Sequence, residues 1–302
     1  MMIGETWLDW ETEGRDWPHR SASRFMEVGD LRWHIQEMGP EHAPVLLFLH
    51  GTGASCHSWR HVLPVLASLY RVVAVDLPCH GFTQPRGRTD LSLPGMTRSI
   101  VQLLQRISVV PAAIIGHSAG AAIAIALAAA IGRGSGPDVI AINGAFLPIR
   151  GDRLFSPMAK LLFANPLSAS MFSLLARTTP LGGNLLSATG SPIDPDGAAL
   201  YKRLLTSSGH VRGALGMMAA WDLTRLDALM RGLSGKILLI AARNDPMVPV
   251  RNSEHVARHV TGARLVLAEH GGHLLHECNA SFVCKAIAEA VKTGRETGAD
   301  AA

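Results

Sequence analysis

The sequence predicts an α/β fold with a mostly parallel central sheet, helices on both faces of the sheet and a helical insertion. Short, continuous apolar runs alternate with stretches of helical spacing, a pattern typical of strands buried inside a parallel sheet. The alternation stops near Gly144 and resumes at residues 236–245. The chain also has 302 residues, 48% of them hydrophobic, which is enough to bury a sizeable core.

The first half of the chain supplies a hairpin and then alternating strands and helices. Residues 23–28 and 31–38 flank a Gly-Asp pair, which predicts the hairpin. Buried strands are expected over residues 44–51, 71–78, 111–116 and 138–144, and helices over 58–70, 93–108 and 119–132. Pro94 suits a first helical turn, whereas Pro64 kinks its helix or marks its first turn. Parallel strands joined by helices imply right-handed crossovers.

Beyond the interruption, the chain returns to the same alternation. Strands are expected over residues 236–245 and 263–270, and helices over 252–260 and 279–292. We therefore expect a core domain formed by residues 1–145 and 232–302, with residues 146–231 inserted as a helical lid.

The insertion is rich in Leu, Ala, Met and Pro and carries an excess of basic residues. Its apolar residues recur at helical spacing in runs at 155–167, 171–176 and 213–221, and prolines break these runs into short pieces. Nine lysines and arginines against five acidic residues give it the whole +4 net charge of the chain. Its methionines suit a flat, irregular apolar ligand, because the methionine side chain is flexible and polarisable.

Composition argues against several classes of protein. The mild positive charge comes without long basic runs, so no nucleic-acid partner is expected. The four cysteines show no CxxC spacing, as expected for free thiols in an intracellular protein. The acidic N-terminus lacks the apolar segment of a secretory signal, and no apolar run reaches the length of a membrane span. A cytoplasmic location is expected.

Residues 116–120 read Gly-His-Ser-Ala-Gly, a match to the G-x-S-x-G pattern. The pattern alone is weak, but here it follows an apolar strand and opens a helix of small residues. In such a strand–turn–helix the serine lies on a sharp, strained turn, with its hydroxyl exposed at the end of the strand. A purely structural glycine-rich turn is the alternative. We take Ser118 as the candidate nucleophile, which needs an adjacent base.

The acid and the base are expected downstream, in the order serine, acid, histidine. Asp245 ends a predicted strand and precedes Pro246, although Asp-Pro is also a common turn. Asp222 and Asp227 fall in the insertion and are less suitable. His273 follows a double glycine at the end of the next strand, which places it at the mouth of the sheet as the general base.

Two other histidines flank this base and raise the alternative of a metal site. His270, His273 and His276 step by three residues, but neither HExxH nor HxxEH is present. No carboxylate is placed as a third ligand. We expect no metal and no cofactor, with His270 and His276 on the surface or behind the catalytic residues.

A loop after the strand at 44–51 is expected to supply the oxyanion hole. The backbone N–H groups of Thr52 and Ala119 are the candidate donors. Glycines at this loop allow close approach of the backbone to a substrate, and the patterns of a phosphate-binding loop are absent. The residues expected to contact the substrate are His50, Gly51, Gly53, His117, Met158, Met217 and Met218.

Together these segments resemble the α/β-hydrolase family over nearly the whole chain. "HGTG", "VDLPCHG", "GHSAG", "RNDPMVP" and "GGHLLHE" occur in the order of that family. One usual glycine is replaced by Cys79, which adds bulk near the entrance of the site. The resemblance implies the α/β-hydrolase fold and a serine hydrolase acting on an ester or a carbon–carbon bond.

A closer resemblance is to the magnesium-chelatase accessory proteins of bacteriochlorophyll biosynthesis. It is carried by "RDWPHRSASRF", "LRWHIQEMG", "HGTGASCHSWR", "DLPCHGFT", "LPGM", "GHSAGAAIA" and "FSPMAKLL". It implies a place in the insertion of magnesium into protoporphyrin IX and a porphyrin intermediate as ligand. It also allows contact with magnesium chelatase and peripheral association with the inner face of the photosynthetic membrane.

Three functions therefore stay open. The first is a serine hydrolase attached to tetrapyrrole metabolism. The second is a generic carboxylesterase or carbon–carbon hydrolase for a hydrophobic small molecule. The third is a non-catalytic module that binds a porphyrin.

Overall fold

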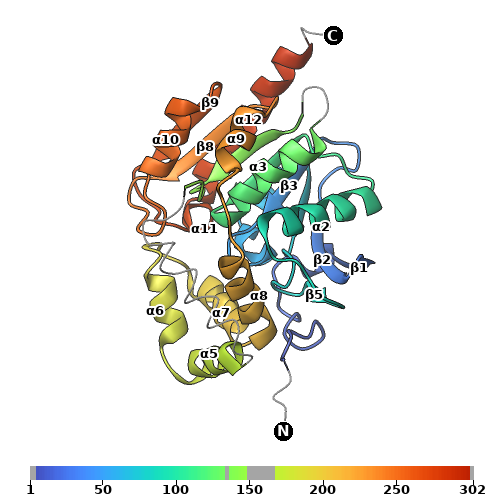
Figure 1. Ribbon diagram of the computed structural model, residues 1–302, viewed down its shortest axis with the longest axis vertical. Coiled ribbons are helices and arrows are strands. Elements are labelled where there is room, and N and C mark those ends of the chain that lie inside the picture. Colours follow the sequence, from blue (N-terminus) through green and yellow to red (C-terminus); the bar gives the residue numbers. More distant parts are fainter. Residues whose placement is uncertain (1–4, 133–135, 148–166, 300–302) are drawn as a thin grey trace.

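A mixed, mostly parallel sheet runs through the centre of the molecule (Figure 1). The computed structural model describes residues 5–132, 136–147 and 167–299, with side chains up to residue 292. The strands in these residues are β1 Ser23–Val28, β2 Leu31–Met38, β3 Val45–Leu49, β4 Arg71–Val75, β5 Gln84–Pro85, β6 Ala113–His117, β7 Asp138–Ile142, β8 Ile237–Ala242 and β9 Ala263–Ala268. Their order is β1-β2-β4-β3-β6-β7-β8-β9, with β5 paired to β2.

The first two strands form the expected hairpin and the others form the expected parallel array. β2 pairs antiparallel with both β1 and β4, and every neighbour from β4 to β9 is parallel. The predicted mostly parallel sheet is confirmed. Because the strands are parallel, the loops that follow β3, β6, β8 and β9 meet at one edge of the sheet.

Helices cover both faces, as expected. Those before the insertion are η1 Arg20–Ala22, η2 Cys56–Trp59, α1 Leu63–Leu66, α2 Leu93–Arg106 and α3 Ala119–Ile131. Those that follow are α5 Leu167–Thr178, α6 Leu181–Ser187, α7 Pro195–Leu205, α8 Ser208–Ala219, α9 Leu226–Arg231, α10 Arg251–His259, α11 Leu275–Cys278 and α12 Ala280–Ala299. No helix in the described residues is long and apolar enough to cross a membrane.

The core has two layers because strand side chains alternate between the faces of the sheet. Leu47 and Leu49 of β3 join a cluster with α2, α3, α9 and α10. Leu46 and Phe48 join a second cluster with η2, α1 and α12. All four side chains are fully buried, so β3 is an interior strand on both faces, as its continuous apolar run indicates.

One predicted helix is wrong in its extent. Instead of a helix over 58–70, the structure has the short 3-10 helix η2 and the single turn α1. Pro64 lies in the first turn of α1. Proline has no N–H and its ring clashes with the carbonyl four residues earlier, so a continuous helix cannot pass through it.

Helices α5 to α9 come from the segment between β7 and β8. In Figure 1, α5 to α8 lie together at the end of the molecule opposite the C-terminus. By contrast, Leu226 and Met230 of α9 are buried in the core cluster with α3. The boundaries of a separate lid at residues 146 and 231 stay a prediction.

Candidate active site

Ser118 lies between β6 and α3 in a backbone conformation that non-glycine residues rarely adopt, with φ 53° and ψ −117°. Its flanking glycines are required by close packing. A Cβ at Gly116 would lie 2.3 Å from the carbonyl oxygen of Gly120, and one at Gly120 would lie 2.3 Å from that of Leu49. Strain of this kind costs about 1–3 kcal/mol and persists only where the surroundings enforce it.

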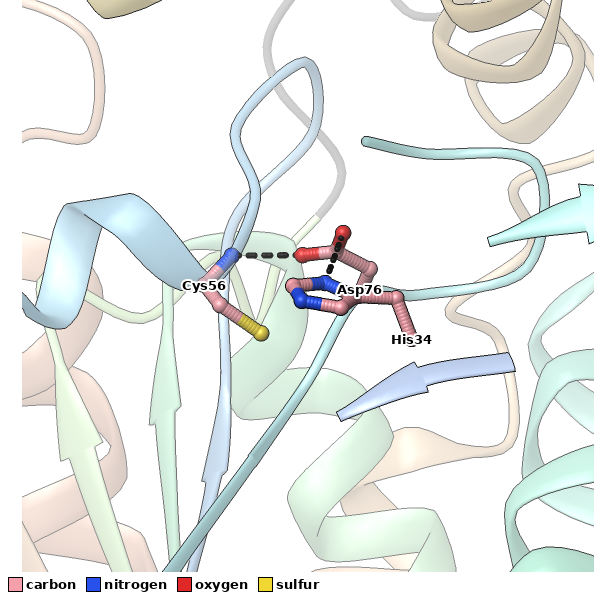
Figure 2. A group of neighbouring side chains, drawn as sticks. All are labelled: His34, Cys56 and Asp76. Atoms are coloured by element: carbon pink, nitrogen blue, oxygen red, sulfur yellow. Dashed lines mark hydrogen bonds and ion pairs between the residues drawn. The ribbon is translucent and has the colours of Figure 1, made fainter. Parts of the chain in front are cut away.

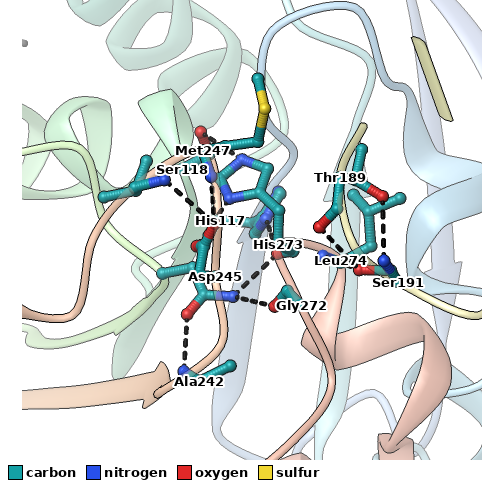
Figure 3. A network of polar contacts seen from close by, with 12 residues as sticks. His117, Ser118, Thr189, Ser191, Ala242, Asp245, Met247, Gly272, His273 and Leu274 are labelled. Atoms are coloured by element: carbon teal, nitrogen blue, oxygen red, sulfur yellow. Dashed lines mark hydrogen bonds and ion pairs between the residues drawn. The ribbon is translucent and has the colours of Figure 1, made fainter. Parts of the chain in front are cut away.

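A continuous chain of hydrogen bonds links Ser118, His273 and Asp245 (Figure 3). His273 Nδ1 lies 2.8 Å from Asp245 Oδ2, and His273 Nε2 lies 3.0 Å from Ser118 Oγ. The carboxylate can only accept, so Nδ1 carries the proton and Nε2 is free to accept from the serine hydroxyl. The three residues expected from sequence therefore lie in hydrogen-bond contact.

The loops around this chain fix its geometry. Asp245 Oδ1 accepts hydrogen bonds from the backbone N–H groups of Met247 at 2.8 Å and Val248 at 3.0 Å. Only its other oxygen is left for the histidine. The carbonyl of His273 accepts two bonds of 2.8 Å, from His117 Nε2 and from Asn143 Nδ2.

Asn143 was missed by the sequence analysis, although a signal for it exists. It follows β7, precedes a glycine and has φ 46°, a left-handed conformation that asparagine tolerates. Its amide also bonds Gly272 O and Ala242 N, at 2.9 Å each. It therefore ties the loop carrying His273 to the end of β8.

The segment between α6 and α7 also holds the histidine loop. The N–H of His273 donates to Thr189 O at 2.8 Å. Ser191 Oγ donates to Gly271 O at 2.8 Å. It accepts from Leu274 N, also at 2.8 Å (Figure 3). His273 is thus held from both the core and the inserted segment.

A four-residue turn after β3 lies beside Ser118. It is closed by Ala54 N–H to Gly51 O at 3.2 Å, with Gly53 at φ 73° in its third position, as in a type II turn. A Cβ at Gly51 would lie 3.1 Å from Ser118 Cβ, so glycine allows the close approach. The N–H of Thr52 takes no part in closing the turn, and Ala119 directly follows the serine.

The expected substrate contacts lie in different surroundings. His50 is fully buried, with Nδ1 bonded to Gly51 O and Nε2 accepting from Leu77 N, so neither nitrogen is left for a ligand. Met217 is also buried, and its sulfur accepts a bond from Thr52 Oγ1 at 3.5 Å. Met218 is 52% exposed. Met158 lies outside the described residues.

The three histidines of residues 270–276 do not share a face. His270 is exposed, whereas His276 is fully buried against the rings of Trp59 and His117. Burial lowers the pKa of His276 well below its ordinary value, so the ring is neutral. The expectation that this stretch holds no metal stays a prediction.

A different buried group brings metal-ligand atom types together in the described residues. Ligand atoms of His34, Cys56 and Asp76 lie within 4.8 Å of one another (Figure 2). The Asp76 oxygens already accept from Cys56 N at 2.7 Å, Phe82 N at 2.8 Å and His34 Nδ1 at 2.8 Å. Burial opposes ionisation of Asp76, but these donors lower its pKa well below the ordinary value. Protein hydrogen bonds therefore account for the group.

The same group contains a second serine–histidine–aspartate arrangement. His34 Nε2 lies 3.0 Å from Ser23 Oγ, and His34 Nδ1 lies 2.8 Å from Asp76. These two distances equal those at Ser118. His34 is fully buried among the rings of Trp10, Phe25 and Phe82. Because Cys56 N bonds Asp76, this arrangement anchors the end of the loop that follows β3.

A buried ionic network links the core to α7. Glu277 is bound by Arg60, and its other oxygen accepts from Tyr201 OH at 2.5 Å. Arg60 also binds Asp194 at 2.6 Å. Burial raises the pKa of Glu277 to about 7, because one guanidinium shared by two carboxylates does not offset the loss of water.

This pKa predicts a pH-dependent stability. The folded protein keeps a proton on Glu277 that the unfolded chain releases above its ordinary pKa of 4.5. The free energy of unfolding therefore falls as pH rises from 4.5 to about 7, by about 3 kcal/mol, and this contribution is constant above that range. Urea unfolding between pH 4.5 and 8 should show a flatter profile for Glu277→Gln.

The matched control is Glu269→Gln, which alters an exposed glutamate in the same region. It should leave the pH profile of the parent unchanged. A Glu277→Gln profile with the slope of the parent would show that this carboxyl group does not titrate as proposed.

Comparisons with known proteins agree with the fold. A model of the alpha/beta hydrolase family matches residues 46–286. The chain is 40% identical over 264 residues to the magnesium-chelatase 30 kDa subunit of Rhodobacter capsulatus, covering 87% of this chain and 92% of that protein. It is 27% identical over 261 residues to the pyrrolizixenacetamide deacetylase of Xenorhabdus hominickii, covering 83% and 91%.

A solved structure extends the likeness of fold to almost the full length. A candidate lipase (lip1) from Acinetobacter baumannii AYE superposes with a TM-score of 0.77, over 98% of this chain and 99% of that one. Sequence identity is only 19%, so this likeness concerns the fold alone.

Proposed function

The chain belongs to the alpha/beta hydrolase family, and on that premise we propose that it is a serine hydrolase with Ser118 as its nucleophile. The observation that carries the proposal is the hydrogen-bond chain from Asp245 through His273 to Ser118, which ends on a strained serine. A serine hydroxyl becomes nucleophilic when such a base can take its proton. The Ser23 arrangement lacks that strained turn.

The proposed reaction proceeds in two halves. Ser118 Oγ attacks an acyl carbon while its proton passes to His273 Nε2, and Asp245 stabilises the imidazolium. The negative oxygen formed is bound by the backbone N–H groups of Thr52 and Ala119. His273 then gives the proton to the leaving group. A water molecule, deprotonated by His273, hydrolyses the acyl-enzyme and regenerates the serine.

We further propose that the substrate is a magnesium-porphyrin intermediate or its precursor, with the chain acting as an accessory protein of a magnesium chelatase. The support is the 40% identity to a protein named as a magnesium-chelatase subunit. Residues 146–231 would form a lid over Ser118. Their surplus of lysine and arginine suits porphyrin carboxylates, and it also suits the anionic surface of a photosynthetic membrane.

One labelling experiment tests both parts of this proposal. A fluorophosphonate should modify the parent protein, and peptide mass analysis should place the label on Ser118. Prior addition of protoporphyrin or its magnesium form should slow the labelling. Labelling that porphyrin does not slow would favour the generic carboxylesterase. A porphyrin that binds, with its spectrum shifted, to a protein that is never labelled would favour the non-catalytic binding module.

A further inference from the structure

Helix α8 of the inserted segment contacts the turn at residues 51–54. His210 Nε2 lies 3.2 Å from Gly53 O, and Met217 Sδ lies 3.5 Å from Thr52 Oγ1. The two side chains are seven residues apart, so they project from the same face of the helix. One face of α8 therefore binds the turn that would supply an oxyanion donor.

The helix is held at this place by very close packing. A Cβ at Gly213, between the two contacts, would lie 2.0 Å from the carbonyl oxygen of Cys79. A Cβ at Gly209 would lie 2.5 Å from the Trp7 ring. Cys79 itself has φ 62°, a backbone conformation that side chains disfavour. Glycine lets α8 approach to backbone contact, which leaves little freedom to shift it.

The hydrogen bonds of His210 define its tautomer. Nδ1 accepts the N–H of Gly81 at 3.0 Å, so a neutral ring carries its proton on Nε2 and donates to Gly53 O. The side chain is fully buried, and burial lowers its pKa to about 4. The ring is therefore neutral near neutral pH, and both of its nitrogens are used.

The bond to Gly53 acts on the peptide unit that closes the turn. This unit joins Gly53 to Ala54, and its N–H donates to Gly51 O. His210 binds the carbonyl on the opposite side of the same unit. Without that bond, the unit would be held only by its N–H bond to Gly51 O, and glycine at φ 73° would let the turn relax. A relaxed turn would change the direction of the Thr52 N–H.

We propose that His210 is a positioning residue, which holds the turn at 51–54 so that the Thr52 N–H points to the oxyanion formed at Ser118. The inference rests on the proposed hydrolase function. If His210 has this role, the oxyanion of the transition state is stabilised fully only when α8 is docked on the turn. Binding of the substrate before reaction depends on other contacts.

The test compares two variants of His210 with a matched control. His210→Leu removes both bonds, whereas His210→Gln can donate from its amide nitrogen and accept on its oxygen. Tyr201→Phe is the control, because it removes another hydrogen bond between the inserted segment and the core, at Glu277 rather than at the turn. All three are assayed with p-nitrophenyl acetate and with a trifluoromethyl ketone inhibitor, which forms a tetrahedral oxyanion.

We expect His210→Leu to lower kcat by about 10- to 100-fold, less than the loss of an oxyanion donor itself, with KM changed by no more than about 3-fold. Binding of the trifluoromethyl ketone should weaken by a factor similar to the loss in kcat/KM. His210→Gln should stay within about 5-fold of the parent, and Tyr201→Phe should keep the parent kcat. A kcat for His210→Leu equal to that of Tyr201→Phe would overturn the inference and leave the hydrolase proposal standing.

A second measurement does not depend on activity. Hydrogen exchange followed by mass spectrometry should show faster exchange in a peptide covering residues 50–56 for His210→Leu, and unchanged exchange there for Tyr201→Phe. If the parent hydrolyses no ester and takes no fluorophosphonate label, the proposed function fails, and this exchange result still decides whether His210 holds the turn. Equal exchange in parent and His210→Leu would refute that role.

Discussion

Replacing Ser118 with alanine is expected to lower ester turnover by about 10³-fold or more. The change removes the atom that would attack the substrate and leaves the His273–Asp245 pair intact. Backbone strain at residue 118 persists, because alanine is no better suited than serine to φ 53°. Hydrolysis of a p-nitrophenyl ester measures the effect, with thermal unfolding to show that the variant is folded.

Ser23→Ala provides a matched control within the same chain. Ser23 has the same bonding to a histidine–aspartate pair, at the same 3.0 and 2.8 Å. Ser23→Ala should lower the free energy of unfolding by about 1 kcal/mol, because one His34 nitrogen loses its hydrogen-bond partner. Ester turnover should stay within about 2-fold of the parent. Near-full activity in Ser118→Ala, or a comparable loss in Ser23→Ala, would show that Ser118 is not the nucleophile.

Asp245→Asn is expected to lower kcat by about 10³- to 10⁴-fold. The amide oxygen of asparagine is needed by the N–H groups of Met247 and Val248, which leaves the NH₂ group facing His273 Nδ1. Nδ1 must then accept, and the proton moves to Nε2. In that tautomer His273 cannot take the proton of Ser118.

Asp222→Asn makes the same chemical change at an exposed residue, whose carboxylate accepts from Thr224 N at 2.9 Å. It should leave the kinetics of the parent unchanged. The tautomer can also be followed by nitrogen NMR of the histidine ring. A variant Asp245→Asn that keeps more than a tenth of the parent activity would exclude Asp245 as the residue that orients the base.

Sequence analysis could place those site residues that are marked by their immediate neighbours in the sequence. Ser118 lies between two glycines after an apolar strand, and His273 follows a double glycine after another. Asp245 ends the strand between them. In a parallel sheet, residues that follow neighbouring strands meet at the same edge, so strand order was enough to bring these side chains together.

The supporting residues could not be placed in this way, because their partners are distant in the sequence. Asn143 bonds a loop 129 to 130 residues away, and His210 bonds a turn 157 residues earlier. Histidine on a helix carries no pattern that distinguishes a satisfied buried ring from an exposed one. The network of Arg60 and Glu277 likewise depends on burial and on a contact across 217 residues.

The bonds from Thr189 and Ser191 to the histidine loop have a consequence for the order in which the protein assembles. His273, Gly271 and Leu274 form these bonds with residues 80 or more positions earlier in the chain. The sheet and Ser118 can therefore form while the histidine loop is held only from the core, by its bonds to His117 and Asn143. The proposed ester hydrolysis would then reach its full rate only after the inserted segment has docked on this loop.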